Sequence, residues 1–566
     1  MKIGGSGPAA GTASATPGPR VRDGGRNGPT ELELVAVVDA IAEHWPDREC
    51  IVWRDRRIVW RELDDRTRCL ASVLRQHGLG VHRDGSGRPW ESRHDHLGLY
   101  LLNGPEYLEG VIAAHRARLA PFNINYRYVE AELAALMNDA GARVVMYHAR
   151  FAPLLAQALE EAVTPPLLLQ VDDESGEALL PGALAYEEAL TAAVPSATDA
   201  HPSPDDLHIL YTGGTTGTPK GVLWRAGDLV TGPLGLAHAD GTPMTIDAVV
   251  EAAGGRSGRA MPVPPLMHGA GLWFALGALL AGGTVVMQRK VDRLDFADVV
   301  DVCIAERVTS LMLVGDSFAR PFVAELERRR EGLPTVRRIV SSGAALSQDV
   351  KDRLGSVLPQ ARVVDTLGSS ETGPQAVGSE GKDVFAPRRW AAVLDSTRTR
   401  RLAPGDPELG WLAQSGPIPL GYLGDRSKTE ATFTAVDGIR HAVAGDRARL
   451  LEDGRILFVG RDSMTVNSGG EKIFVEEVEG VLRSTAGVTD AVVVGRPSPR
   501  WGEELVAIVQ VMAGAHLEGE DLARSCRAQL AAYKVPKAFI FGEVRRHQNG
   551  KLDYAWARAR ARNGDG

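Results

Sequence analysis

The sequence predicts an α/β protein with a large N-terminal multi-sheet body and a small C-terminal α+β cap domain. From Pro29 onward, helical periodicities alternate with short β-branched runs, which is typical of largely parallel sheets covered by helices. The chain has 566 residues, too many for one ordinary core. Near Gly460 the sequence changes to a shorter mixture of helix and strand, enough for a small separate domain.

In the body, predicted to span 29–459, the expected elements are a helix at 32–42 and strands at 143–147 and 207–211. Two further strands, in 336–345 and 362–373, end in small and hydroxyl residues, the pattern of ligand-facing loops at strand ends. The Gly- and Pro-rich stretch 238–265 lacks sustained periodicity and is expected to be a long surface insertion.

In the cap, predicted to span 460–566, a Gly-rich turn is expected at 467–470, followed by an acidic amphipathic helix at 475–482. Apolar strands are expected at 491–494 and 505–511. The Arg- and Ala-rich segment 555–562 is expected to be a frayed basic helix.

Composition limits the classes of protein that this chain can represent. Its apolar content of 44% is that of a soluble globular protein, and its net charge of −8 argues against general affinity for nucleic acid or anionic membrane. Residues 1–28 lack the apolar core of a signal peptide and are expected to form a disordered tail. No apolar run approaches the length of a transmembrane helix. The four cysteines show no CxxC spacing, so a cytoplasmic location is expected, without a zinc site or disulfide framework.

The segment 211–222, Tyr-Thr-Gly-Gly-Thr-Thr-Gly-Thr-Pro-Lys-Gly-Val, predicts a loop that holds a nucleotide triphosphate. Glycines let backbone amides approach phosphate oxygens, threonine hydroxyls add donors or a Mg²⁺ ligand, and Lys220 supplies a cation. A Walker A loop places its lysine directly after the last glycine, whereas here Thr218 and Pro219 intervene. Because proline disfavours a helical conformation in the residue before it, this is a phosphate loop of another kind.

This loop opens an ordered series of motifs that resembles the adenylate-forming superfamily of AMP-forming acyl- and aryl-CoA synthetases, adenylation domains and firefly-type luciferases. The later motifs are Pro-Pro-Leu-Met-His-Gly-Ala-Gly at 264–271, Ser-Gly-Ala-Ala-Leu at 342–346, Gly-Ser-Ser-Glu-Thr at 368–372, Ala-Gly-Asp at 444–446, Gly-Arg-Asp at 460–462 and Gln-Asn-Gly-Lys-Leu-Asp at 548–553. The resemblance runs from about residue 30 to about residue 555. The chain departs from the usual pattern at Gly213, Leu367 and Ala444, where serine, an aromatic residue and threonine are commoner.

The resemblance implies catalytic roles for Lys551, His268 and Glu371. Lys551 would bridge the substrate carboxylate and the α-phosphate, so that a fixed cation offsets their repulsion. Glu371 and Thr216 are expected to hold Mg²⁺, which takes few protein ligands. The residues implied to bind ATP are Thr212, Gly213, Gly214, Thr215, Thr216, Gly217, Lys220, Gly343, Ala344, Ala345, Gly368, Ser369, Ser370, Asp446 (at the ribose) and Arg461.

The acyl pocket is implied to contain His268, Gly269, Gly271, Trp273, Gly343 and Gly368. The wall at 269–274 offers no charged partner for an amino group, which favours an apolar acid over an amino acid. Core packing of Trp273 is an equally open interpretation. Segments 121–128, 466–479 and 500–504 look most like bacterial fatty-acyl-CoA ligases, including a branch that acts on steroid side-chain acids.

For CoA, the resemblance implies a thiol tunnel lined by Ser468, Gly469, Gly470 and Lys472, and a cap that rotates about a hinge at 460–464 with no single pivot assigned. The predicted function is therefore a two-step ligase that forms acyl-AMP and then transfers the acyl group to CoA. Two alternatives stay open: transfer to an acyl carrier protein, and a nucleotide-binding regulatory protein without catalysis, against which the intact Glu371, Asp446, Arg461 and Lys551 argue. The sequence leaves the identity of the acid and a homodimeric state open.

Overall fold

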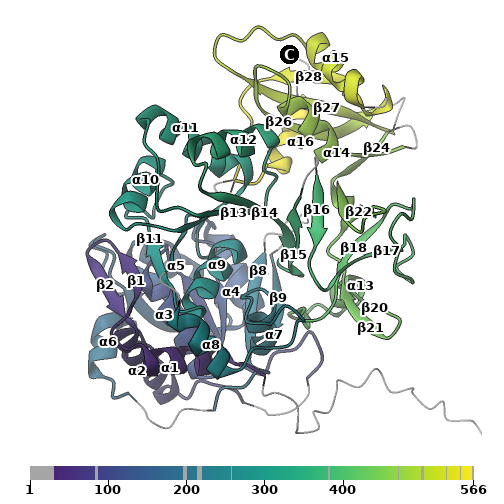
Figure 1. Cartoon of the computed structure of the whole chain (residues 1–566). Coiled ribbons are helices and arrows are strands. Elements are labelled where there is room, and N and C mark those ends of the chain that lie inside the picture. Colours follow the sequence, from purple (N-terminus) through teal and green to yellow (C-terminus); the bar gives the residue numbers. More distant parts are fainter. Residues whose placement is uncertain are drawn as a thin grey trace, which may run out of the picture.

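The computed structural model describes residues 31–82, 87–195, 201–212, 219–255, 258–379, 383–468, 471–498, 502–530, 532–547 and 550–563. The predicted tail at 1–28 lies outside these ranges. Within them, two large sheets build the body and a third builds a small C-terminal domain, which sits at the top of the molecule in Figure 1. The predicted fold class is confirmed.

The first sheet, with eight strands among the described residues, has the order β19-β9-β8-β4-β3-β5-β6-β7 and is parallel from β8 to β7. Its strands are β3 (His96–Tyr100), β4 (Ala120–Asn123), β5 (Ala142–His148), β6 (Leu167–Val171), β7 (Leu184–Ala185), β8 (Leu207–Thr212), β9 (Lys220–Arg225) and β19 (Gly421–Tyr422). The predicted strands at 143–147 and 207–211 are confirmed as β5 and β8, whose apolar runs are buried on both faces.

The second sheet begins with parallel strands and continues with antiparallel ones, in the order β2-β1-β11-β10-β12-β13-β14-β15-β16-β23-β22-β18-β21-β20, with β17 paired to β18. The strands of its first part are β1 (Glu49–Trp53), β2 (Arg56–Val59), β10 (Arg259–Pro262), β11 (Thr284–Met287), β12 (Ser310–Leu313), β13 (Arg338–Ser342) and β14 (Arg362–Ser369). Those of its second part are β15 (Gly373–Gly378), β16 (Val384–Pro387), β17 (Ala391–Leu394), β18 (Gly410–Gln414), β20 (Phe433–Val436), β21 (Ile439–Ala442), β22 (Asp446–Leu450) and β23 (Ile456–Arg461).

Helices fill three layers around these two sheets. The middle layer contributes to a shared core and comprises α1 (Leu34–His44), α2 (Trp60–Gln76), α3 (Pro105–Arg116) and α9 (Gly269–Leu280). The outer layer on the first sheet comprises α4 (Glu130–Ala140) and α5 (Ala152–Leu159), and that on the second comprises α10 (Phe296–Ala305), α11 (Gly315–Arg329) and α12 (Gln348–Val357). Smaller body helices are α6 (Tyr186–Ala192), α7 (Ala226–Thr231), α8 (Ile246–Gly254), α13 (Arg426–Thr432) and the 3-10 turn η1 (Ala149–Phe151).

The C-terminal domain follows a 3-10 turn, η2 (Asp462–Met464), directly after β23. Its strands are β24 (Thr465–Ser468), β25 (Glu471–Phe474), β26 (Val488–Ser498), β27 (Gly502–Val511) and β28 (Ala538–Phe541). One face of this sheet packs on α14 (Val475–Arg483) and α15 (Gly519–Gln529), and the other on α16 (Tyr554–Asn563); η3 (Ala532–Lys534) leads into β28. The predicted domain boundary at 459 and 460 stays a prediction.

Two local predictions are wrong. The stretch 238–265 is not a surface insertion, because it contributes α8 and the buried strand β10 within the second sheet. Four residues with glycine and proline nearby gave β10 too short a pattern to recognise. The helix predicted at 555–562 is not frayed: Ala557 and Ala561 of α16 are fully buried against β26 and β27.

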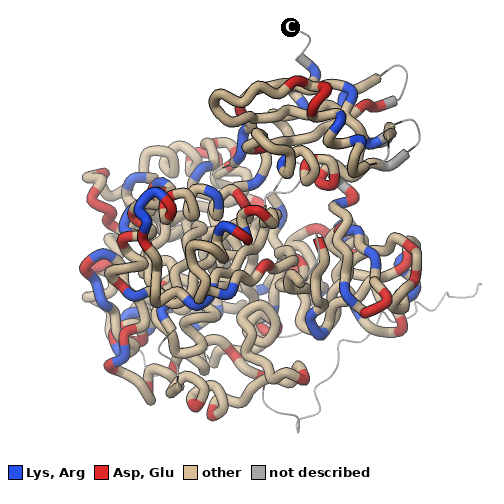
Figure 2. The backbone as a smooth tube through the Cα atoms, turned by 45° about the horizontal axis from the view of Figure 1, so that its top comes forward, with Lys and Arg blue, Asp and Glu red and all other residues tan. Residues whose placement is uncertain are grey.

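Acidic and basic residues are interspersed along the chain in Figure 2. The four cysteines are free thiols. Within the described ranges, no helix combines the length and the apolar character that a membrane span requires.

Candidate active site

A cavity of about 3230 Å³ lies at the carboxyl ends of the parallel strands, where the body meets the C-terminal domain. Its walls come from the loops after β8, β10, β13 and β14, from β22 and β23, and from the C-terminal domain. Predicted site residues that line it are Thr212, His268, Gly269, Trp273, Gly343, Ala344, Ala345, Gly368, Ser369, Ser370, Glu371, Asp446, Arg461 and Lys551. The fold thus brings together motifs that are far apart in the sequence.

Other predicted residues lie elsewhere. Gly213, Gly214, Thr215, Thr216, Gly217, Gly469 and Gly470 lie outside the described residues. Gly271 is buried in the first turn of α9, where an added Cβ would lie 2.6 Å from the carbonyl oxygen of Pro265. Lys220 begins β9 opposite Thr212, and its Nζ lies 3.4 Å from Asp425. The roles assigned to all of these residues stay predictions.

Asn123, at the end of β4, joins two of the predicted motifs. Its side-chain amide donates hydrogen bonds to the carbonyl oxygens of Tyr211 (2.9 Å) and Met267 (2.8 Å), and its Oδ1 accepts one from the amide of Tyr211 (2.7 Å). Tyr211 is the first residue of the predicted phosphate-loop segment 211–222, and Met267 precedes His268 directly. One buried amide therefore fixes the base of the phosphate loop relative to the histidine motif.

Two glycines explain why small residues recur at the end of β14 and in the loop after β13. Gly343 has φ of +85°, a conformation that side-chain-bearing residues rarely adopt. Gly368 lies against Gly373 across the β14–β15 pair, where an added Cβ would overlap the backbone. The loop after β14 is also anchored to β9, because the indole of Trp224 donates a 3.0 Å hydrogen bond to the carbonyl of Ser370.

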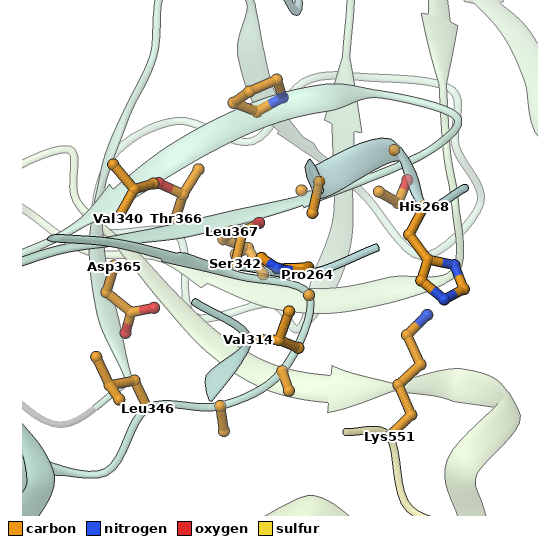
Figure 3. Close-up of a pocket in the computed structure, with 18 of the residues that line it drawn as sticks. Pro264, His268, Val314, Val340, Ser342, Leu346, Asp365, Thr366, Leu367 and Lys551 are labelled. Atoms are coloured by element: carbon orange, nitrogen blue, oxygen red, sulfur yellow. The ribbon is translucent and has the colours of Figure 1, made fainter. Parts of the chain in front are cut away.

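Lys551 enters the cavity from the C-terminal domain, and its ammonium group points toward the ring of His268 (Figure 3). Its side chain is enclosed by protein yet exposed to the cavity. Desolvation, helped by the charge of Arg461, lowers the pKa of Lys551, and Glu371 opposes this shift. Desolvation and the charges of Lys551 and Arg127 lower the pKa of His268 to about 3. His268 is therefore neutral at physiological pH, and its buried Nε2 has no hydrogen-bond partner in the structure.

Glu371 has a structural partner that the sequence did not indicate. The hydroxyl of Tyr422 donates a 2.8 Å hydrogen bond to its Oε1, which orients the carboxylate at the cavity wall. Among the described residues, no group of three or more His, Cys, Asp and Glu could hold a metal ion. A single oriented carboxylate fits Mg²⁺ that keeps its waters and binds phosphate oxygens, the usual manner of Mg²⁺ in nucleotide sites.

Asp446 and Arg461 face each other across β22 and β23. The guanidinium Nε of Arg461 donates a 2.8 Å hydrogen bond to Oδ1 of Asp446, which is almost fully buried. The charge of Asp446 raises the pKa of Arg461 above its ordinary value. Both residues line the cavity, so the pair presents a fixed charge pattern at its rim.

An apolar branch of the cavity runs along one face of the second sheet. Alternate residues of the parallel strands face this branch, whereas their neighbours pack into the core under α10 to α12. The sheet side is formed by Ala260, Met312 and Val340, and the helix side by Val249, Ala252, Trp273, Phe274, Gly277 and Ala281 of α8, α9 and the end of α9. The branch reaches Gly258 and Thr309 at the amino ends of β10 and β12. At about 3.3 Å per residue, the four steps along β13 alone give it roughly 13 Å of length.

Trp273 satisfies both interpretations of the sequence. It lines the cavity, and it also packs edge-on against Trp224 with ring centroids 5.8 Å apart. Its buried indole nitrogen has no hydrogen-bond partner in the structure.

Of the predicted CoA-binding residues, Ser468 is buried in β24 and Lys472 belongs to β25. From the C-terminal domain, Lys551 lines the cavity together with residues of α14.

Asn123, Tyr422 and Asp365 are among the site residues that sequence reasoning missed. Asp365 lines the cavity near Leu346 (Figure 3), and its carboxylate lies 2.9 Å from Lys351. Its place in β14, three residues before Gly368, was the available signal. Asn123 and Tyr422 act through contacts 88 and 51 residues away, which no local pattern reveals.

Comparison with known proteins agrees with this geometry. The model of the AMP-binding enzyme family matches residues 38–417, and that of the AMP-binding enzyme C-terminal domain matches 477–551. The chain is 45% identical over 547 residues to the medium-chain acyl-CoA ligase Mig of Mycobacterium avium, covering 94% of this chain and 99% of that protein. It is 32% identical to the 3-oxocholest-4-en-26-oate–CoA ligase of Rhodococcus rhodochrous, covering 93% and 95%.

Among solved structures, ATP-bound MatB from Rhodopseudomonas palustris shares the fold. Its TM-score is 0.77 at 22% identity, covering 94% of this chain and all of that one. Fold and site together define an adenylate-forming enzyme. The chain belongs to the AMP-binding enzyme family.

Proposed function

We propose that this chain is an ATP-dependent acyl-CoA ligase that activates an apolar carboxylic acid as acyl-AMP and then transfers the acyl group to CoA. One observation carries the proposal. Lys551 reaches the neutral His268 in a cavity that joins the ATP-site residues to a long apolar branch. The two relatives of this chain named above are acyl-CoA ligases for medium-chain and steroid acids. Their names support CoA as the acceptor and an apolar acid as the substrate.

In the first step, a carboxylate oxygen of the acid attacks the α-phosphorus of ATP, and pyrophosphate leaves. Both reactants are anionic, and a preorganised cation stabilises charge that develops on the α-phosphate. Lys551 is the cation placed to do this, while Asp446 accepts hydrogen bonds from the ribose hydroxyls. His268 is neutral and so adds no positive charge, and it can orient an oxygen of the carboxylate or phosphate by a hydrogen bond.

We propose that Mg²⁺ accompanies ATP and is held by Glu371 and Thr216. When bound, the ion neutralises charge on the phosphates. Tyr422 keeps one oxygen of Glu371 hydrogen-bonded, which leaves the other oxygen as the natural ligand.

In the second step, the thiolate sulfur of CoA attacks the carbonyl carbon of the mixed anhydride, and AMP leaves. The turn that we assign to CoA, with Ser468, Gly469, Gly470 and Lys472, has to approach the carbonyl for this step. We therefore propose that the C-terminal domain, residues 460–566, pivots within 460–464 on the body, residues 29–459. The four free cysteines are compatible with the reducing cytoplasm, where we place the reaction.

The test is a panel of fatty, aromatic, steroid and amino acids, each assayed for pyrophosphate release and then for thioester formation. CoA and a holo acyl carrier protein are offered as acceptors in parallel, and the products are identified by mass. We expect acyl-CoA from apolar acids. Thioester on the carrier protein alone would replace CoA as acceptor, and no pyrophosphate release with any acid would refute ligase activity.

A further inference from the structure

Glu476, in the first turn of α14, connects the C-terminal domain to β23, the strand of the second sheet whose last two residues begin the predicted hinge at 460–464. Its Oε1 accepts a 3.2 Å hydrogen bond from the backbone amide of Arg461, which belongs to β23 of the second sheet. Its Oε2 faces Gly460, where an added Cβ would lie 2.9 Å away. The contact therefore spans the short η2 segment that joins the two parts of the chain.

The surroundings of Glu476 suit a neutral carboxyl group better than a carboxylate. Its Oε2 is buried without a hydrogen-bond partner in the structure. Arg461, which faces it from β23, directs its guanidinium to Asp446. Glu479 follows one turn later in α14, and its carboxylate already accepts hydrogen bonds from the amide of Val493 and, on α16, from the hydroxyl of Tyr554. Desolvation, followed by the charge of Glu479, raises the pKa of Glu476 to about 8.

The same domain contacts the body a second time, directly beside Lys551. Gly550 packs on Ser317 and Phe318 of α11 so closely that an added Cβ would overlap the serine hydroxyl. The position of Lys551 in the cavity thus depends on how the C-terminal domain docks on the body, which we call its seated position. Glu476 contributes a hydrogen bond at one end of this docking interface, and Gly550 contributes a packing contact at the other.

We propose that Glu476 is a positioning residue, which holds the C-terminal domain in the orientation that places Lys551 beside His268 for adenylate formation. This inference rests on the proposed ligase function. The seated arrangement needs the carboxyl group of Glu476 to be neutral, because an ionised one would lack a cation of its own in a desolvated place. Unseating the domain returns the group to water, so it releases a proton when the domain leaves.

The sign of the pH dependence follows from this raised pKa. Seating is strongest below the ordinary carboxyl pKa of 4.5, weakens as pH rises toward about 8, and is constant above that value. Glutamine at this position keeps the shape and the acceptor oxygen but does not ionise. The effect of pH on seating through this residue should therefore vanish in Glu476→Gln.

The experiment compares wild type, Glu476→Gln and Glu476→Ala, with Glu477→Gln as the matched control. Glu477 is the next residue of α14, and its carboxylate pairs with Lys534 at 2.6 Å inside the C-terminal domain. Two rates are measured between pH 4.5 and about 8. They are acid-dependent ATP–pyrophosphate exchange and thioester formation from supplied acyl-adenylate.

We expect Glu476→Ala to lower exchange about tenfold, the effect of one hydrogen bond, and to leave the thioester step unchanged. The ratio of the Glu476→Gln exchange rate to the wild-type rate should rise with pH, while that of Glu477→Gln stays flat. A flat ratio for Glu476→Gln, or equal loss of both rates in Glu476→Ala, overturns the proposal.

A second readout does not depend on activity. Hydrogen exchange of the Arg461 amide should be faster in Glu476→Ala than in wild type, because its acceptor is gone. Unchanged exchange of this amide would refute the contact, whereas absence of pyrophosphate exchange in wild type as well would refute the ligase function instead.

Discussion

The hydroxyl of Tyr422 donates a hydrogen bond of 2.8 Å to Oε1 of Glu371, from β19 of the first sheet to the loop after β14 of the second. The desolvated phenol, next to the charge of Glu371, has its pKa raised and stays protonated. It therefore remains a hydrogen-bond donor at physiological pH. Through this bond the first sheet orients the carboxylate of Glu371, which the second sheet supplies.

Tyr422→Phe should raise the Mg²⁺ concentration needed for half-maximal pyrophosphate exchange about tenfold, because the carboxylate loses its orienting partner. Saturating Mg²⁺ should restore most of the rate. Tyr128→Phe, which alters another hydroxyl of the cavity wall, serves as the control. An unchanged Mg²⁺ requirement in Tyr422→Phe would argue against Glu371 as the ligand.

Lys551→Ala should lower adenylate formation by about 10²–10³, since one preorganised charge is lost from the transition state. Thioester formation from supplied acyl-adenylate should stay close to the wild-type rate. Lys290→Ala, at an exposed lysine paired with Asp295 outside the cavity, should change neither rate. Equal loss of both half-reactions in Lys551→Ala would contradict its assignment to the first step.

Asn123→Ala should destabilise the protein by about 3 kcal/mol, because buried backbone groups of Tyr211 and Met267 lose their partners. Thermal unfolding measures the loss, and the KM for ATP should rise along with it. Asn138→Ala removes exposed hydrogen bonds to Glu161 and Val163 and should cost much less. Similar midpoints for the two variants would show that the Asn123 contacts do not stabilise the site.

Ala281→Phe should shorten the acids that the enzyme accepts. The new ring would fill the apolar branch near its far end, so long acids should lose activity while short ones keep theirs. The measurement is kcat/KM for a series of fatty acids of rising length. Ala305→Phe, at an exposed position of α10, is the control, and a parallel fall for every acid would place the acyl tail elsewhere.

Acid should destabilise the protein through His115 and His208. Desolvation lowers the pKa of His115 to about 4 and that of His208 to about 3. Unfolding exposes both rings, which then take up protons below their ordinary pKa of 6.5. Stability is therefore full above that value and is lost as pH falls toward the folded pKa, by about 1.4 kcal/mol per pH unit for each ring. His208→Gln should make the unfolding midpoint less dependent on pH across this window, and an unchanged slope would contradict the prediction.

The sequence was informative where one local pattern carried the information. β8, β13, β14 and α14 were all predictable, because their apolar residues recur at the spacing of strand or helix. β10 was missed because its four residues show too little alternation, although it lies inside the second sheet. Motif order indicated residues from distant parts of the sequence that meet at the cavity. Asn123, Tyr422 and Glu476 could not be found in this way, since their importance arises only when the chain folds and distant backbone or side-chain groups meet them.

The apolar branch ends at the amino ends of β10 and β12. The loops that carry the predicted ATP-binding residues follow the opposite, carboxyl ends of the parallel strands. In the proposed ligase, the acyl tail is therefore recognised about one strand length away from the reacting atoms. Substitutions at the far end of the branch do not contact the proposed catalytic residues. Substrate preference can therefore change during evolution while the catalytic residues stay the same. The same separation gives protein engineers a region to vary freely when a new acid is wanted.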